Sequence, residues 1–531
     1  MRETQATLTG SCAFSVGGVH TIWLISAILA LVCILSVSTS CRQAVAAKGD
    51  INIAVAAGPI TLDPRLATDA ESDKISSLIC DGLLGRDDDG GLTPMLADRF
   101  ERISDTSYRF FLRDGLLFHD GTPLTAEDVV YTFSSIMDGS ISSPFRSSFT
   151  RVAAIEAESP TVVRLDLKEP FAPFLSYLTR GIVSKKAALA AGASFGTHPV
   201  CAGPYKLVRF SPDNVVELEA NAAYYGEKPR NARLLFDVIK DDNVRALKLI
   251  KGDVDLVQNG IPALIIDGIT KSGEIRMKNG DGSVMSYMGM NLTDPILSNK
   301  KVRQAIAYAI DRDEIISHRF KGMASKANSI LSPANWAYDG ELPQYPFDPA
   351  KAMQLMDEAG FKDPDGPGPL PRFRLTYKTS TVKERVEIAR MIAHQLEKVG
   401  ISVRVAPYEW ATFYRDVRKG NFQIYTLSWV GVSDPDIFHE VCGSSQFPPN
   451  GLNRDRYKNA EVDALVEQGR TTMDEGERKK IYSRVQQIVF DDLPYVPLWY
   501  EKNVVLYRKG LEGVRVRPDA SYRVFMDVGK K

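Results

Sequence analysis

Histidines, cysteines and carboxylates are the side chains of this sequence that could bind a metal or catalyse a reaction. The six histidines never stand as a close pair, so they lack the spacing of metal ligands. They are His20, His119, His198, His318, His394 and His439. Neighbouring acidic residues occur at Asp87–Asp89 and Asp491–Asp492, in turn-like or helix-end contexts where a solvated surface role is expected. We therefore predict no metal site, no cofactor and no pair of catalytic carboxylates.

Short motifs of the common enzyme classes give no catalytic centre either. We identify no G-x-S-x-G elbow, no Walker A loop, no G-x-G-x-x-G that opens a helix and no H-E-x-x-H. A hydrolase of envelope peptides would need a nucleophile beside a base, and we identify no such pair. An enzyme is therefore the less favoured hypothesis, and a binding protein is the favoured one.

Composition and charge indicate which classes of binding partner to expect. The chain has 531 residues, enough for about three domains or two large ones. It is 44% hydrophobic and 25% charged, close to the average of soluble globular proteins. Because 65 Lys and Arg balance 66 Asp and Glu, no bulk field attracts nucleic acid or anionic lipid. We expect no nucleic-acid partner.

The first 41 residues set the compartment. No Asp, Glu, Lys or Arg occurs from Thr4 to Cys41, and Thr21–Val37 is almost continuously apolar. This run has about the minimum length that spans a bilayer, and the small residues Ser38–Ser40 before Cys41 favour cleavage of a signal peptide. The segment resembles a bacterial lipobox, which implies that Cys41 carries a lipid. An uncleaved anchor and a released secreted protein are the alternatives, and all three place the body of the protein outside the cytoplasmic membrane.

The remaining cysteines could form one bridge at most. After Cys41 only Cys80, Cys201 and Cys442 are left, too few and too scattered for a zinc site or a disulfide scaffold. An oxidising compartment would permit a bridge between Cys80 and Cys201. The sequence leaves that bridge open.

The elements that must position a binding site are those of a mixed α/β chain. Strands are predicted at Ile51–Ala56 and Tyr108–Gly115. A helix is predicted after Thr125, which stands as an N-cap with Asp128 three residues later. Apolar residues at helical spacing predict the buried face of this helix: Val129, Phe133 and Ile136.

Helices and strands alternate again in the second half of the chain. Asp348 stands as an N-cap, Pro349 as the first helical residue and Gly360 as the C-terminal stop. A second helix is predicted over Glu384–Gly400, followed by a strand at Ile401–Val405. A helix that feeds a strand in this way is typical of an α/β domain.

A third helix is predicted after Asp474. Glu477, three residues later, completes the pattern of a capping box. The spacing predicts that this helix buries Ile481, Val485 and Ile488.

The main crossing between domains is predicted near the middle of the chain. Asn279–Ser283, with the sequence NGDGS, is predicted to be a turn. A strand-like segment, Val284–Leu292, follows it, and the character of the chain changes there. We therefore place the domain crossing at this segment.

Five segments, in order, resemble one family. They look like the family-5 extracellular solute-binding proteins of ABC importers, the group that holds dipeptide-, oligopeptide- and nickel-binding proteins. The segments are Phe118–Phe133, Ala202–Phe210, Arg245–Val257, Asn299–Ile316 and Asp348–Phe361. The similarity runs from about Ile51 to Arg508, nearly the whole mature chain.

The resemblance implies an α/β fold with two lobes, the class II periplasmic-binding-protein fold with a large first lobe and a ligand cleft between the lobes. After a leader at 1–41 and a tether at 42–49, lobe I would comprise 50–286 and 503–531, and lobe II 287–502. The expected function is a monomeric receptor that binds a peptide and delivers it to an ABC permease and its ATPase. It would act in the periplasm or cell envelope, anchored to a membrane through its N-terminus.

The resemblance also implies which residues bind the ligand. In relatives that bind peptides, the ligand pairs with extended segments of the receptor like an added strand. The matching positions are Gly58, Tyr287, Met288, Asn291, Trp429, Gly431, Val432, Ser433 and Asp434. Trp429 could be a core residue or an aromatic floor on which the ligand stacks.

One expected ligand anchor has no counterpart in the sequence. Peptide-binding relatives commonly carry an Asp shortly after the matching Trp, where it pairs with the ligand's α-ammonium group. Here that position is Val432. Either Asp434 takes over the role, or the ligand is a blocked peptide or a non-peptide solute such as an opine, a sugar or a metal chelate. An envelope sensor or chaperone with the same cleft is a further alternative.

Overall fold

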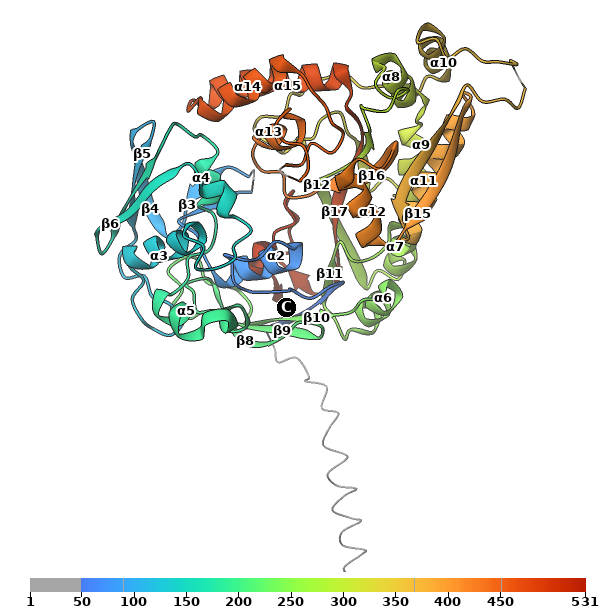
Figure 1. Ribbon diagram of the computed structural model, residues 1–531. Coiled ribbons are helices and arrows are strands. Elements are labelled where there is room, and N and C mark those ends of the chain that lie inside the picture. Colours follow the sequence, from blue (N-terminus) through green and yellow to red (C-terminus); the bar gives the residue numbers. More distant parts are fainter. Residues whose placement is uncertain (1–48, 89, 367, 450) are drawn as a thin grey trace, which may run out of the picture. The chain divides into compact units, whose positions relative to one another are not determined.

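A large mixed sheet runs through the computed structural model, which describes residues 49–88, 90–366, 368–449 and 451–531 (Figure 1). The sheet has 11 strands. From one edge to the other they are β15 (Ile401–Tyr408), β14 (Phe373–Ser380), β16 (Ile424–Trp429), β12 (Ile275–Met290), β17 (Tyr495–Arg508), β11 (Leu256–Gln258), β1 (Asp50–Val55), β10 (Arg233–Val238), β9 (Val215–Ala220) and β8 (Tyr205–Ser211), and β13 (Ala324–Lys326) pairs with β17.

Two long antiparallel strands, β12 and β17, join the two halves of this sheet. Their register runs from Ile275 opposite Arg508 to Gly289 opposite Tyr495. At one end β17 pairs with β11, next to β1, and at the other end β12 pairs with β16. The predicted strand Val284–Leu292 thus corresponds to the last part of β12, which ends at Met290, two residues earlier than predicted.

The predicted turn at Asn279–Ser283 is wrong. These residues belong to β12, and the register with β17 shifts between Gly280 and Val284, as at a β-bulge. A Cβ atom on Gly282 would lie 2.1 Å from the carbonyl oxygen of Glu501, so glycine allows the two backbones to approach closely. The glycines that resemble a turn signal serve this bulge.

The sheet half with β14, β16 and β12 is covered on both faces, because successive residues of a strand face opposite sides. Ile424 and Met290 pack in one cluster with α8 (Lys300–Ala309), α9 (Arg312–Arg319), α10 (Pro349–Glu358) and α11 (Lys383–Glu397). Tyr425 and Leu427 pack in another cluster with α12 (Trp410–Lys419), α13 (Ile437–Cys442), α14 (Ala460–Thr471) and α15 (Glu475–Asp492). The strands of this half are therefore held in the middle of a three-layer arrangement.

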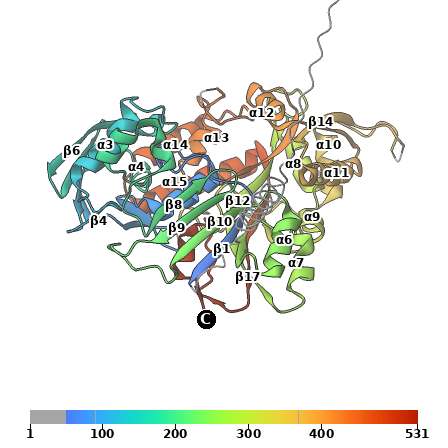
Figure 2. The ribbon, with the colours of Figure 1, turned by 90° about the horizontal axis from the view of Figure 1, so that it is seen from below.

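The other half of the sheet is built around β1, which corresponds to the strand that the sequence predicts at Ile51–Ala56. Figure 2 shows β8, β9, β10 and β1 side by side, and β1 pairs in parallel with β10 and β11. On one face lie α2 (Ala70–Ile79), α5 (Lys185–Ala191) and the 3-10 helices Gly192–Thr197 and Tyr522–Asp527. On the other lie α6 (Asp242–Lys251) and α7 (Ala263–Thr270).

A separate four-stranded antiparallel sheet carries its own core. Its order is β4 (Ala97–Ser104), β5 (Ser107–Leu112), β7 (Val162–Leu167) and β6 (Val152–Ser159). The helix predicted after Thr125 is α3 (Ala126–Met137), with the capping box and the buried residues that were expected. The smaller elements of the chain are α4 (Phe174–Tyr177), the 3-10 helix Arg146–Phe149 and the strand pairs β2 (Leu84–Arg86) with β3 (Leu92–Pro94) and β18 (Leu511–Glu512) with β19 (Gly529–Lys530).

Two later helices begin where the sequence predicts. The carboxylate of Asp348 accepts from Lys351 N at the start of α10, and that of Asp474 accepts from Glu477 N at the start of α15. The predicted buried face of α15 is wrong in part, because Ile481 and Ile488 are only half-buried. The helix instead buries Arg478, Tyr482, Val485, Gln486 and Val489. Hydrogen bonds of Arg478 to Asp434 and of Gln486 with Ser329 hold this face of α15 against the rest of the protein.

A disulfide joins Cys80, at the end of α2, to Cys201, which settles the bridge that the sequence left open. Among the described residues, no helix is long and apolar enough to cross a membrane. The predicted leader at 1–41, with Cys41, and all but the last residue of the tether lie outside the described residues.

Candidate ligand-binding site

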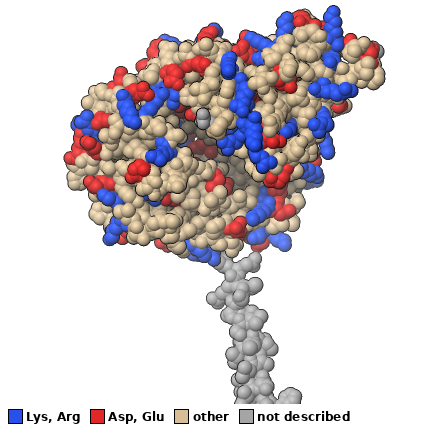
Figure 3. Space-filling view, viewed as in Figure 1, with Lys and Arg blue, Asp and Glu red and all other residues tan. Residues whose placement is uncertain are grey.

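The crossing strands lie at a hollow of the protein surface. Figure 3 shows this hollow near the centre of the face viewed, between α4 on one side and β16 and α12 on the other in Figure 1. Most of the predicted contact residues come from β12 or from the segment that follows β16. The fold therefore gathers them on one part of the molecule.

Trp429, the last residue of β16, is half-buried in an aromatic and cationic cluster. Its ring stacks on Tyr287 of β12, with centroids 5.8 Å apart and planes 7° apart. The guanidinium carbon of Arg454 lies 4.5 Å from the centroid of the Trp429 ring. One side of the Trp429 ring is thus packed and the rest of the ring is accessible. The residue combines the two roles that the sequence left open, a core residue and an aromatic surface for the ligand.

Arg454 is a site residue that the sequence analysis missed. Its Nη1 donates to the hydroxyl of Tyr287 at 2.8 Å and its Nη2 to that of Tyr414 at 3.4 Å. It is 7% exposed, and no described carboxylate lies within ion-pair distance of it. A guanidinium with phenol partners on aromatic rings can bind an anionic group. In the sequence Arg454 stands in a polar, charged stretch, Asn453–Asn459, which gives no signal of a buried guanidinium.

Two predicted residues of β12, and Asn291 just after it, have buried side chains that contact other parts of the protein. Tyr287 and Met288 are almost fully buried, on opposite faces of the sheet. Asn291 donates through Nδ2 to the carbonyl oxygens of Gly420 and Phe422, at 3.1 and 3.0 Å. In this structure these side chains hold the strands of the hollow in place.

Gly58 follows β1 and lies against the chain at Pro212. A Cβ atom on Gly58 would lie 1.6 Å from the Pro212 carbonyl oxygen. This close approach explains why glycine stands there.

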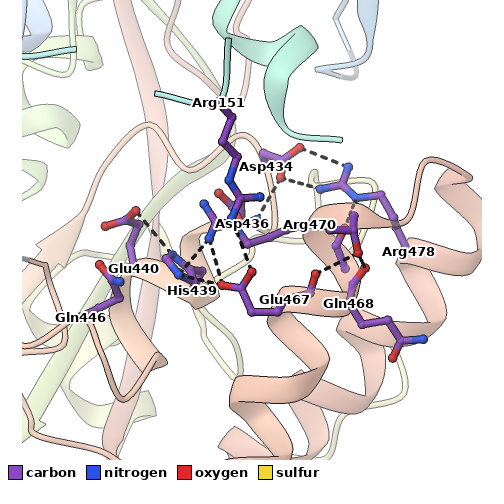
Figure 4. A network of polar contacts seen from close by, with 12 residues as sticks. Arg151, Asp434, Asp436, His439, Glu440, Gln446, Glu467, Gln468, Arg470 and Arg478 are labelled. Carbon is purple, nitrogen blue, oxygen red and sulfur yellow. Dashed lines mark hydrogen bonds and ion pairs between the residues drawn. The ribbon is translucent and has the colours of Figure 1, made fainter. Parts of the chain in front are cut away.

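The segment after Trp429 has an exposed part and a paired part. Gly431, with φ of +72°, and Ser433 are exposed, while Val432 packs partly against the core. The carboxylate of Asp434 accepts from Arg478 Nη2 at 2.9 Å and Nη1 at 3.4 Å (Figure 4). Asp434 therefore already has a cationic partner on α15.

An ion-pair network continues from Asp434 toward the four-stranded sheet (Figure 4). Asp436 pairs with Arg470 at 2.9 Å, and Glu467 pairs with Arg470 at 3.0 Å and with Arg151 at 3.5 Å. Burial raises the pKa of the Asp436 carboxyl to about 6. Ala172 N also donates to Arg470 O at 2.8 Å. These contacts tie α14 to the unit that contains β6.

Two observations on the described residues concern metal and hydrolase chemistry. No group of three or more His, Cys, Asp or Glu residues there could hold a metal ion. Contrary to the expectation from the sequence, Gly192–Gly196 does have the letters of the hydrolase motif G-x-S-x-G. It lies in a 3-10 helix rather than a strand-to-helix turn, and Ser194 Oγ donates to Ala191 O at 2.8 Å.

Comparison with known proteins agrees with the resemblance in the sequence. The sequence model of the bacterial extracellular solute-binding proteins, family 5 Middle, matches residues 91–447. The glutathione-binding protein GsiB of Shigella dysenteriae is 28% identical over 510 residues, which cover 94% of this chain and 97% of that protein.

Two solved structures extend the agreement to the fold. The oligopeptide-binding protein AppA from Bacillus subtilis, in complex with a nonapeptide, is 27% identical with a TM-score of 0.76, over 91% of this chain and 99% of AppA. NikZ from Campylobacter jejuni, in complex with Ni(L-His), is 25% identical with a TM-score of 0.78, over 91% of this chain and 100% of NikZ. The predicted two-lobed α/β fold is confirmed, and the chain belongs to the family-5 bacterial extracellular solute-binding proteins.

Proposed function

We propose that this chain is the receptor of an ABC importer, which binds a peptide outside the cytoplasm and delivers it to a membrane permease driven by an ATPase. The observation that carries the proposal is the likeness to AppA, solved with a nonapeptide, over nearly the whole of both chains. The membership of an extracellular binding-protein family supports it as well. The chain would bind its solute and release it unaltered, as a receptor and not an enzyme.

The two lobes would be 50–286 with 503–531, and 287–502. The support is that β12 and β17 each belong to both halves of the large sheet. A pair of crossing strands can serve as a hinge, and a ligand that contacts both lobes stabilises the closed form. The permease could then distinguish loaded from empty receptor by this closure.

The remaining sequence predictions stand as part of the proposal. The leader 1–41 would be removed, Cys41 would carry the lipid and 42–49 would tether a monomeric receptor to the membrane. A tether raises the local concentration of receptor at the permease, so a strong binding interface is not needed.

A metal chelate is a second candidate ligand. NikZ binds Ni(L-His), and here Asp434, the proposed substitute for the missing ammonium anchor, is already paired with Arg478. The cationic Arg454 beside Trp429 would suit the carboxylates of such a chelate.

A thermal-shift screen of the purified protein decides between the two ligand classes. We expect synthetic di- to nonapeptides to raise the melting temperature, increasingly with the logarithm of concentration. A matched arm contains nickel with L-histidine, and controls contain either alone. No shift with any peptide would contradict the peptide assignment, and a shift with the nickel–histidine arm alone would establish the chelate.

A further inference from the structure

We propose that Glu501, with Ser286 and Ser428, forms the subsite that binds the protonated primary amine of the ligand. This inference rests on the proposed function, because it assigns the group that recognises a peptide's amino terminus. None of the three residues is among the predicted contacts.

The three side chains form a row across neighbouring strands. Ser428 on β16 pairs directly with Ser286 on β12, and their hydroxyl oxygens are 2.9 Å apart. Ser286 pairs in turn with Trp499 on β17, so Glu501, two residues further along β17, lies on the same face of the sheet. Ser286 Oγ donates to Glu501 Oε1 at 3.2 Å. The row ends on a carboxylate where β12 and β17 cross between the halves of the sheet.

Within the described part of the chain, the Glu501 carboxylate lacks a cationic partner. Among the described residues, no Lys, Arg or His lies within ion-pair distance of it, and Ser286 is the one side chain that donates to it. Other carboxylates in this region are paired: Glu384 with Arg319 at 3.1 Å, and Asp416 with Lys378 at 2.7 Å.

Its surroundings make a cation favourable there. Burial raises the pKa of the Glu501 carboxyl, which means that the ionised form lacks enough solvation or positive charge. The charged groups that face it come from the first turn of α11: Glu384 raises the pKa further, and Arg385 lowers it. The Arg385 guanidinium lies 5.4 Å from the centroid of the exposed Trp410 ring and does not pair with Glu501. Glu501 itself keeps an accessible fraction, so a ligand can reach it.

Two further polar atoms on this part of the sheet have no hydrogen-bond partner among the described residues. They are Trp499 Nε1, on β17, and Ser380 Oγ, at the end of β14 next to β16. Both residues are 1% exposed. Buried polar groups are nearly always satisfied, and Trp499 lies two residues from Glu501 on the same face of the sheet, so its unpaired Nε1 is an independent sign of a polar occupant there. Ser380 lies three residues after Tyr377, a residue of the Trp499 face, and so on the opposite face.

The chemistry of the row favours a primary ammonium group. An ammonium carries three donors, and the row offers a carboxylate and two hydroxyl oxygens as acceptors. A guanidinium prefers both oxygens of a carboxylate in one plane, and here Ser286 already engages one of them. A divalent metal would need more oxygen ligands than these.

The test compares free and blocked amino termini by isothermal titration. The probes are a defined pool of synthetic tri- and pentapeptides and the same pool with N-acetyl groups, titrated into the wild type, Glu501→Gln and the control Glu384→Gln. We expect the wild type to bind the free-amino pool at least about tenfold more tightly than the acetylated pool. Glu501→Gln should lose that preference and Glu384→Gln should keep it.

A pH series on the wild type gives a second measurement that needs no variant. Because burial raises the pKa of the Glu501 carboxyl, this group ionises as the pH rises. The affinity of the wild-type protein for the free-amino pool should therefore increase with pH. The affinity for the acetylated pool should stay flat.

Equal binding of both pools by the wild type, or an unchanged preference in Glu501→Gln, would overturn the assignment of Glu501 while leaving the peptide receptor intact. Binding of neither pool by the wild type would overturn both.

Discussion

At the scale of single residues, Trp429 links packing to ligand binding. Its stacking on Tyr287 and its contact with Arg454 predict that Trp429→Ala lowers the free energy of unfolding by about 2 kcal/mol. The accessible part of the ring predicts that the dissociation constant for a ligand peptide rises about tenfold. Urea unfolding and titration calorimetry measure the two effects.

Trp429→Phe is the matched control, because it keeps an aromatic ring on Tyr287. We expect it to retain most of the stability and part of the affinity. Unchanged peptide affinity in Trp429→Ala would show that this residue has no role in binding.

His119 should make stability depend on pH. Its Nε2 lies 3.1 Å from the carbonyl oxygen of Gly203, its buried Nδ1 has no partner among the described residues, and burial lowers its pKa to about 4. The folded state therefore resists protonation, whereas the unfolded histidine titrates near pH 6.5. Stability should be full above pH 6.5 and fall by up to about 3 kcal/mol toward pH 4.

The measurement is urea unfolding of the wild type and His119→Gln between pH 7.5 and pH 4. The difference in stability between the two proteins should narrow as the pH falls. If the stabilities of the two proteins differ by the same amount at every pH in this range, His119 is not the cause of the pH dependence.

The sequence allowed some residue contacts to be predicted but not others, for a physical reason. Cys80 and Cys201 could be considered as a pair because few cysteines remain. Arg454 reaches Tyr287, 167 residues away, and Glu501 reaches Ser286, 215 residues away, only because strands bring them together. A single sequence carries no signal for such pairings.

At the scale of elements, local chemistry determines what could be predicted. The N-caps Thr125, Asp348 and Asp474 act on residues within one turn, and all three helices begin there. The buried face of α15 was predicted in part wrongly because Arg478 and Gln486 are buried by bonds to distant Asp434 and Ser329. The order of the large sheet depends on long-range pairing and was beyond prediction from pattern alone.

The disulfide between Cys80 and Cys201, at the C-terminal end of α2, should stabilise the folded protein. It joins α2 to the segment before β8 across 121 residues of sequence, a long loop whose closure restricts the unfolded chain. We expect Cys80→Ser with Cys201→Ser to lose about 2–5 kcal/mol of stability, measured by urea unfolding.

Cys442→Ser is the control for loss of a buried cysteine, because Cys442 is bonded to no other cysteine that the structure describes. A reducing agent should lower the stability of Cys442→Ser in urea unfolding as much as it lowers that of the wild type. If the reducing agent leaves the stability of the wild type unchanged, the bridge does not contribute.

At the scale of the whole molecule, we expect the two proposed lobes to close when a ligand binds. β12 and β17 connect the two halves of the large sheet, and the contacts of Arg151 and Ala172 with α14 show that the four-stranded unit and α14 touch. If two lobes close on a peptide, small-angle X-ray scattering should record a smaller radius of gyration with peptide than without. An unchanged radius at saturating peptide would argue against a hinge.

An importer receptor encloses a small solute and returns it intact. Native mass spectrometry of the purified protein after incubation with the synthetic peptide pool, followed by denaturation and analysis of the released ligand, tests it most directly. We expect one peptide for each protein chain, released with its original mass. Retention of no peptide, or release of shortened fragments, would contradict it.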